Sequence, residues 1–104
     1  MSNPLTTQTG RRASSHTASA ARWLEARAVE LDPRYRRAWL RLVWCDAEAA
    51  SNARVRGDLV GAESALRQAE ESRSALARVD PEGAYAREAE LVLARARQGL
   101  ERVP

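Results

Sequence analysis

The residues that could perform covalent or metal chemistry are few in this chain of 104 residues. Cys45 is the only cysteine and His16 the only histidine, so neither a disulfide within the chain nor a metal site built from cysteine or histidine is expected. The sequence has no glycine-rich phosphate loop and no H-E-x-x-H pattern. We therefore predict that the chain is not an enzyme, that it has no catalytic or metal-binding residues, and that it needs no cofactor.

The carboxylates include several surface residues and one exception. Glu63, Glu70 and Glu71 follow the spacing of the solvent face of a helix, so we expect them on the surface. Asp46 falls near the middle of an apolar arc, where an isolated carboxylate is costly. Arg73 lies in an apolar stripe of the following helix, but an antiparallel arrangement places it nearer the level of residue 40. Asp46 therefore needs another partner or access to solvent; we interpret it as a structural acid, and a functional role is the open alternative.

The elements that must position these side chains are helices. Ala, Leu, Arg, Glu and Gln dominate from about residue 18 onward, and all five favour helices. The predicted helices span residues 15–31, 34–56, 59–79 and 82–102. Because the connections have only two or three residues, consecutive helices are expected to lie antiparallel, as stacked hairpins. The sequence thus predicts an all-α domain at residues 14–104, preceded by a flexible polar tail at residues 1–13.

Apolar residues recur along each predicted helix at about 100° per residue. For residues 15–31 the expected core face is Thr17, Ala21, Leu24, Ala28 and Leu31, with Trp23 to one side. For residues 59–79 it is Leu59, Ala62, Leu66, Ala69, Leu76 and Val79. For residues 82–102 it is Tyr85, Ala86, Ala89, Val92, Leu93, Ala96 and Leu100. Residues 34–56 are apolar around most of the helix, which predicts that this helix is central or covered by a partner.

Three pairs of residues divide the helices. Proline disfavours helical geometry in the residue before it, so Asp32-Pro33 and Asp80-Pro81 should each end one helix. The aspartate is then expected to cap the next helix, with proline at its first position. Gly57-Asp58 is expected to act as a glycine stop followed by an aspartate cap.

The stretch "AVELDPRYRRAWLRL" resembles the junction between two tetratricopeptide repeats. Ala21, Ala28 and Pro33 fit the end of one repeat, and Trp39 and Leu42 fit the start of the next. The resemblance covers residues 18–44. It implies a stack of helical hairpins, and we expect the second Asp-Pro pair to begin a C-terminal capping helix.

In tetratricopeptide proteins the first helix of each pair lines a groove that holds a peptide. Arg37, Leu40, Trp44 and Ala47 match those positions, and Arg41 completes the predicted protein-binding set. The resemblance therefore implies a small non-catalytic adaptor or assembly protein that binds a protein or peptide segment through residues 34–56. The alternative for Trp44 is that the last helix folds over this stripe and makes it part of the core.

Two further functions stay open. All 17 basic residues are arginine, but 14 acidic residues are interleaved with them and the net charge is only +3, which is typical of a solvated helical surface. An arginine-mediated binder of nucleic acid or another polyanion would use the arginines at positions 34, 36, 37 and 41 with the Arg11-Arg12 pair. A homodimeric structural subunit would bury Trp23 or the surplus apolar surface of residues 34–56.

The remaining predictions concern source and location. Lys, Ile and Phe are absent together, which indicates the coding bias of a GC-rich genome and a bacterial source. No stretch approaches the 18 apolar residues of a membrane span, and the Arg11-Arg12 pair has no apolar run behind it. We therefore predict a cytoplasmic protein with no membrane span.

Overall fold

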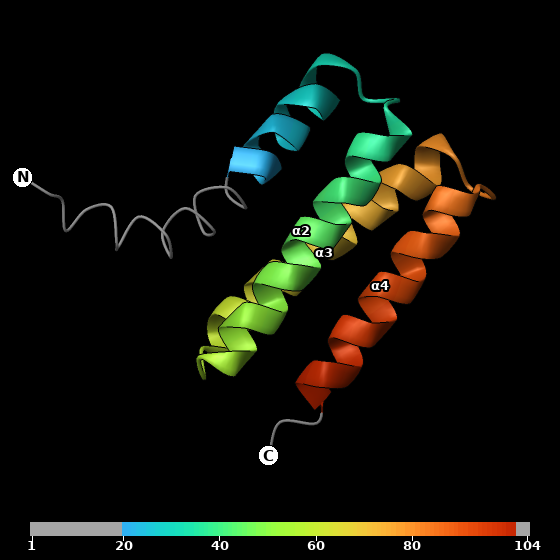
Figure 1. The fold of residues 1–104 in the computed structure, drawn as a ribbon. Helices are drawn as coiled ribbons and strands as arrows, with labels where there is room; N and C mark the ends of the chain where they lie inside the picture. Colours follow the sequence, from blue (N-terminus) through green and yellow to red (C-terminus); the bar gives the residue numbers. More distant parts are fainter. Residues whose placement is uncertain (1–19, 102–104) are drawn as a thin grey trace, which may run out of the picture.

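The computed structural model describes residues 20–101, and these residues form four helices and no strand. A helix occupies residues 20–31, followed by α2 (Arg36–Val55), α3 (Leu59–Val79) and α4 (Ala84–Glu101) (Figure 1). The predicted all-α fold class is confirmed. None of these helices is both long and apolar enough to cross a membrane. The tail predicted at residues 1–13 lies outside the described residues.

The helix α2 is the centre of the arrangement. Helix 20–31 and α4 flank it, and α3 runs antiparallel behind it (Figure 1). Two contacts define the register of α4 along α2: Arg36 pairs with Asp80 in the turn before α4, and Trp44 donates to Glu88 of α4, each across 44 positions of sequence. At the other end, Gly99 of α4 lies against the Arg54 side chain. The two helices therefore run parallel, side by side.

Small side chains dominate the core and allow the helices to pack closely. The main buried cluster joins α2, α3 and α4 and consists of Leu40, Val43, Ala47, Ala50, Leu66, Ala69, Leu76, Ala86, Ala89, Val92 and Leu93. The core faces predicted for α3 and α4 are largely confirmed by this cluster. Leu59 and Tyr85, at the first turns of these two helices, are the exposed exceptions.

The core face predicted for the first helix is largely wrong, although Ala28 is partly buried beside Val29; Thr17 lies outside the described residues. Leu24 is 60% exposed and Leu31 73% exposed, whereas Val29 is buried in a small cluster with Ala38 and Leu42 of α2. The helix is rotated so that Arg22 reaches Asp46 on α2. The physical reason is that a buried carboxylate needs a counterion, and this rotation lets Arg22 of helix 20–31 supply one.

The Gly57-Asp58 break is confirmed in detail. Gly57 has φ = +81°, a left-handed conformation that glycine adopts without steric cost. Asp58 then occupies the N-cap of α3, and its Oδ1 accepts a hydrogen bond from the backbone N–H of Gly61 at 2.9 Å. The chain reverses here between α2 and α3.

The prediction that Asp32 caps the second helix is wrong. The helix α2 begins at Arg36, its N-cap residue is Tyr35, and no side chain caps it. Asp32 Oδ1 instead accepts from the backbone N–H of Arg34 at 3.1 Å, and the Trp39 indole donates to the Pro33 carbonyl at 2.7 Å. Asp32-Pro33 therefore forms a turn of its own, which ends before the N-cap residue Tyr35 of α2.

The second Asp-Pro pair forms a similar turn. The helix α4 begins at Ala84 rather than Glu82, and Asp80 pairs with Arg36 of α2 at 3.4 Å. The Asp80 carboxylate lies over Gly83, where an added Cβ would collide with it. This turn links the end of α3 to the beginning of α2 as well as to α4.

Candidate protein-binding surface

The five residues predicted to bind a partner divide into two groups in the structure. Leu40 and Ala47 are buried in the main cluster, on the side of α2 that α4 covers. Arg37, Arg41 and Trp44 are exposed on the outer side of the same helix. The outer strip of α2, defined here as Arg37, Arg41 and Trp44, is therefore the part of the set that a partner could reach.

Trp44 lies at the border between α2 and α4. Its side chain is 44% exposed, and its indole Nε1 donates a hydrogen bond to Glu88 Oε2 of α4 at 3.0 Å. The alternative in which α4 covers the whole stripe therefore applies to Leu40 and Ala47, and Trp44 keeps a large open face. Because its polar edge is held by Glu88, the ring has a defined orientation.

The α4 side of this border carries Tyr85, one turn before Glu88. Tyr85 is partly exposed, and the register of 44 positions places it level with Arg41. It is a residue that the sequence prediction assigned to the core instead of to the surface. Tyr85 lies in the first turn of α4, at the end of the helix.

Arg37 and Arg41 differ in their electrostatic environment. Arg41 Nη1 lies 3.1 Å from Glu25 Oε2 of helix 20–31. Arg37 has no acidic partner among residues 20–101. Arg37 is thus the arginine of the outer strip whose charge is available to an incoming acidic group.

Asp46 is paired with Arg22 in a partly buried, two-point interaction. Arg22 Nε donates to Oδ1 at 2.7 Å and Arg22 Nη2 donates to Oδ2 at 3.2 Å. The Asp46 side chain is only 3% exposed, and this hydrogen bonding raises the pKa of the Arg22 guanidinium. The expectation that Asp46 must have a partner is confirmed.

Sequence reasoning missed Arg22 as that partner. The signal was present, because Arg22, Glu25, Ala26 and Val29 share a face at helical spacing, but a more apolar face competed with it. Arg73, the partner considered from the sequence, pairs with Glu90 of α4 at 3.7 Å instead.

Cys45 has the environment of a structural thiol. It is partly buried beside Asp46, and burial is the main cause that raises its pKa, with the nearby carboxylates of Asp46 and Glu25 adding to the effect. A raised pKa reduces the thiolate fraction, so the residue is a poor nucleophile. No group of His, Cys, Asp and Glu within residues 20–101 is arranged to hold a metal ion.

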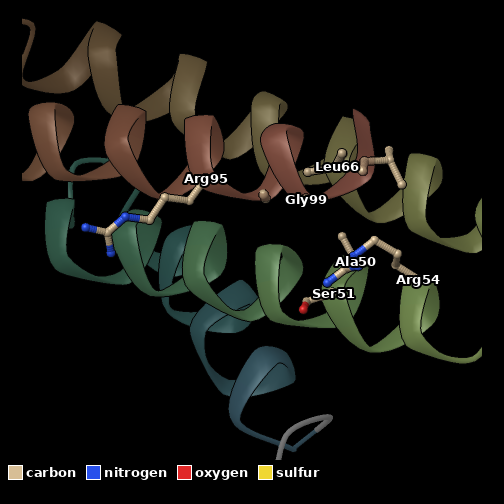
Figure 2. A pocket seen from close by; sticks show the side chains of 8 residues that line it. Ala50, Ser51, Arg54, Leu66, Arg95 and Gly99 are labelled. Carbon is tan, nitrogen blue, oxygen red and sulfur yellow. The ribbon is translucent and has the colours of Figure 1, made fainter. Parts of the chain in front are cut away.

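A pocket lies between α4 and the second half of α2. Figure 2 shows it, and its lining residues are Ala50, Ser51, Arg54, Leu66, Arg95, Ala96, Gly99 and Leu100. In this view the Arg54 side chain extends toward Ser51, and the Arg95 side chain extends away from the other labelled residues. The two arginine side chains do not converge on a common point, so the pocket has no shared site for an anion.

Six of the fourteen arginines in residues 20–101 form ion pairs, and five of these pairs join one helix or turn to another. The ion pairs that cross from one helix or turn to another are Arg22–Asp46, Arg41–Glu25, Arg36–Asp80, Arg73–Glu90 and Arg97–Glu70. These five arginines therefore contribute to the contacts between helices, whereas the other arginines of residues 20–101, Arg37 among them, have no ion-pair partner in another helix.

No protein-family model, no curated protein and no solved structure matches this chain. The candidate surface is therefore characterised by its own geometry: an open, oriented Trp44 with Arg37 and Arg41 on α2, bordered by Tyr85 and Glu88 on α4.

Proposed function

We propose that this chain is a small, non-catalytic adaptor or assembly protein of the cytoplasm, built as a tetratricopeptide-like stack. It binds a segment of a partner protein along the outer strip of α2 and its border with α4. Trp44 anchors the segment and Arg37 and Arg41 flank it. Leu40 and Ala47 support the strip from beneath, because they pack under α4.

The observation that carries the proposal is the state of Trp44. A tryptophan on a helix that packs on three sides could have been buried, yet nearly half of this one faces solvent while Glu88 holds its indole N–H. Tryptophan is the side chain most enriched among residues that dominate binding energy. A pre-oriented aromatic ring loses little side-chain entropy on binding, which favours its use as an anchor.

The chemistry of the surface defines the kind of segment that fits. An aliphatic or aromatic side chain would pack on the open face of Trp44. Acidic side chains would pair with Arg37, which has no acidic partner within residues 20–101, and with Arg41, whose contact with Glu25 is at the surface. We therefore propose a segment that combines an apolar anchor with acidic residues on one side.

A displayed peptide library tests the proposal without knowledge of the partner. Peptides selected on the immobilised wild-type protein are measured against Trp44→Ala and against Leu91→Ala, which removes an exposed apolar side chain from the outer face of α4. We expect selected peptides to carry an apolar residue with neighbouring acids, and to lose at least tenfold in affinity on Trp44→Ala but not on Leu91→Ala.

Thermal melting separates binding from folding in this experiment. Trp44→Ala should melt close to the wild type, because the residue is half exposed and its hydrogen bond to Glu88 lies at the surface. Peptides that bind the two variants equally, or a Trp44→Ala protein that no longer folds cooperatively, would contradict the proposal.

A further inference from the structure

The outer face of helix 20–31 is an apolar surface that the outer strip of α2 does not use. Trp23 is 64% exposed, and Leu24 and Leu31, on the same side of the helix, are exposed to a similar degree. The opposite face of the helix packs on α2 through Val29 and the Arg22–Asp46 pair. Figure 1 shows this helix at the side of α2 away from α4.

Few large apolar side chains occur in residues 1–19 and 102–104. Residues 1–19 contain only two large apolar side chains, Met1 and Leu5, and residues 102–104 contain only Val103. A helix that covers another normally supplies an apolar side chain on every turn. A second copy of the same face supplies Trp23, Leu24 and Leu31 on one helix and can cover it.

We propose that this face is the interface of a homodimer, in which the helices at residues 20–31 of two copies pack antiparallel about a twofold axis. With the axis beside residues 27 and 28, Leu24 of each copy lies level with Leu31 of the other. A twofold contact of this kind uses the same surface on both subunits, as closed dimers do.

The charges between the leucines are self-complementary in this arrangement. Arg27 and Glu30 form an exposed ion pair at 2.9 Å within the helix. In the antiparallel pair, Glu30 of the second copy comes about two residues, or ~3 Å along the axis, from the level of Arg27. The two arginines near the axis are therefore bracketed by two glutamates, one from each copy.

The area available makes this a weak dimer. The exposed parts of Trp23, Leu24 and Leu31 amount to roughly 400 Å² in each copy, within the range of patches that are often functional. With the aliphatic stems of Arg27 and Glu30 included, the two copies together bury about 1,000 Å² of accessible surface, the lower limit for a specific interface. We expect a dissociation constant in the micromolar range or weaker.

Charge reversal provides the sharpest test. Sedimentation velocity is run on a concentration series that reaches about 1 mM, with circular dichroism to verify folding. Wild type should shift from monomer to dimer. Arg27→Glu alone places four acids at the axis and Glu30→Arg alone places four arginines there, so each variant should weaken self-association by at least tenfold. An equimolar mixture of the two variants should form a heterodimer, because their charges are opposite.

A second pair of variants tests the apolar contact. Leu24→Ser should abolish self-association, whereas Leu91→Ser, which changes an equally exposed leucine on α4, should leave it unchanged. A wild type that stays monomeric at about 1 mM would overturn the proposal. Self-association that persists in Leu24→Ser, or a mixture of the charge variants that stays monomeric, would also overturn it.

Discussion

Removal of Arg22 should destabilise this protein far more than removal of a neighbouring surface arginine. Arg22→Ala leaves the Asp46 carboxylate, 3% exposed, without either of its two hydrogen bonds from the guanidinium. Breaking one side of a fully buried ion pair costs about 3–5 kcal/mol. Because the Arg22 side chain is 38% exposed, water can partly replace it, and we expect a loss of about 2–3 kcal/mol in the free energy of unfolding.

The same helix offers a matched control. Arg27→Ala makes the same chemical change, but Arg27 pairs with Glu30 on the surface, where both side chains are more than half exposed. Such a pair three residues apart contributes about 0.2–0.5 kcal/mol. Urea denaturation followed by circular dichroism, at a concentration low enough to keep the protein monomeric, measures both variants.

A double variant separates the charge from the packing. Replacing both members, as in Arg22→Leu with Asp46→Leu, removes the carboxylate that needs a partner, so we expect it to recover most of the stability that Arg22→Ala loses. If Arg22→Ala lowers the free energy of unfolding no more than Arg27→Ala does, Asp46 does not depend on Arg22. The Arg22–Asp46 pair would then not set the rotation of helix 20–31.

Three smaller predictions concern the turns and the thiol. Asp58→Ala should lower the free energy of unfolding by about 1 kcal/mol, because it removes the cap of α3. Asp32→Ala should lower it by only about half as much, because Asp32 caps no helix; urea titrations of the two variants measure both losses. Gly57→Ala should cost about 1 kcal/mol by the same measurement, since φ = +81° is unfavourable for alanine although no atom lies within 4 Å of an added Cβ. Cys45 should react with iodoacetamide more slowly in the native protein than in guanidinium chloride at about pH 8, because its raised pKa lowers the thiolate fraction. By linkage, the stability that Cys45 contributes is present below the thiol pKa of the unfolded chain and is lost as the pH rises through the higher pKa of the folded protein.

Local signals in the sequence were sufficient for most of the helices. Gly57 and Asp58 specify both a left-handed stop and a cap within two residues, so the turn between α2 and α3 was predictable. The single apolar stripes of α3 and α4 were equally clear. The Asp-Pro turns were harder to predict, because each aspartate could either cap the next helix or bind another group. Asp32 accepts from the backbone N–H of Arg34 and Asp80 pairs with the Arg36 guanidinium.

The first helix shows where sequence patterns fail. It has two candidate faces, and the more apolar one, with Leu24 and Leu31, is the one left exposed. The choice between them depends on Asp46, which is 24 positions away from Arg22 in the sequence. The local periodicity of the helix contains no information about the need of Asp46 for a counterion. Trp44 posed a similar problem, because its exposure depends on how closely α4 approaches.

The parallel register of α2 and α4 has a consequence for how the chain folds. The hydrogen bond from Trp44 to Glu88 joins these helices across 44 positions, whereas the α2–α3 hairpin can close progressively from the turn at Gly57. The entropic cost of loop closure rises only as the logarithm of loop length. Once the hairpin has formed, packing of α4 against α2 therefore adds only a small entropic cost. The expected order is therefore hairpin first and α4 second, with contacts local enough for folding within milliseconds. In this order the hydrogen bond from Trp44 to Glu88 forms after the α2–α3 hairpin.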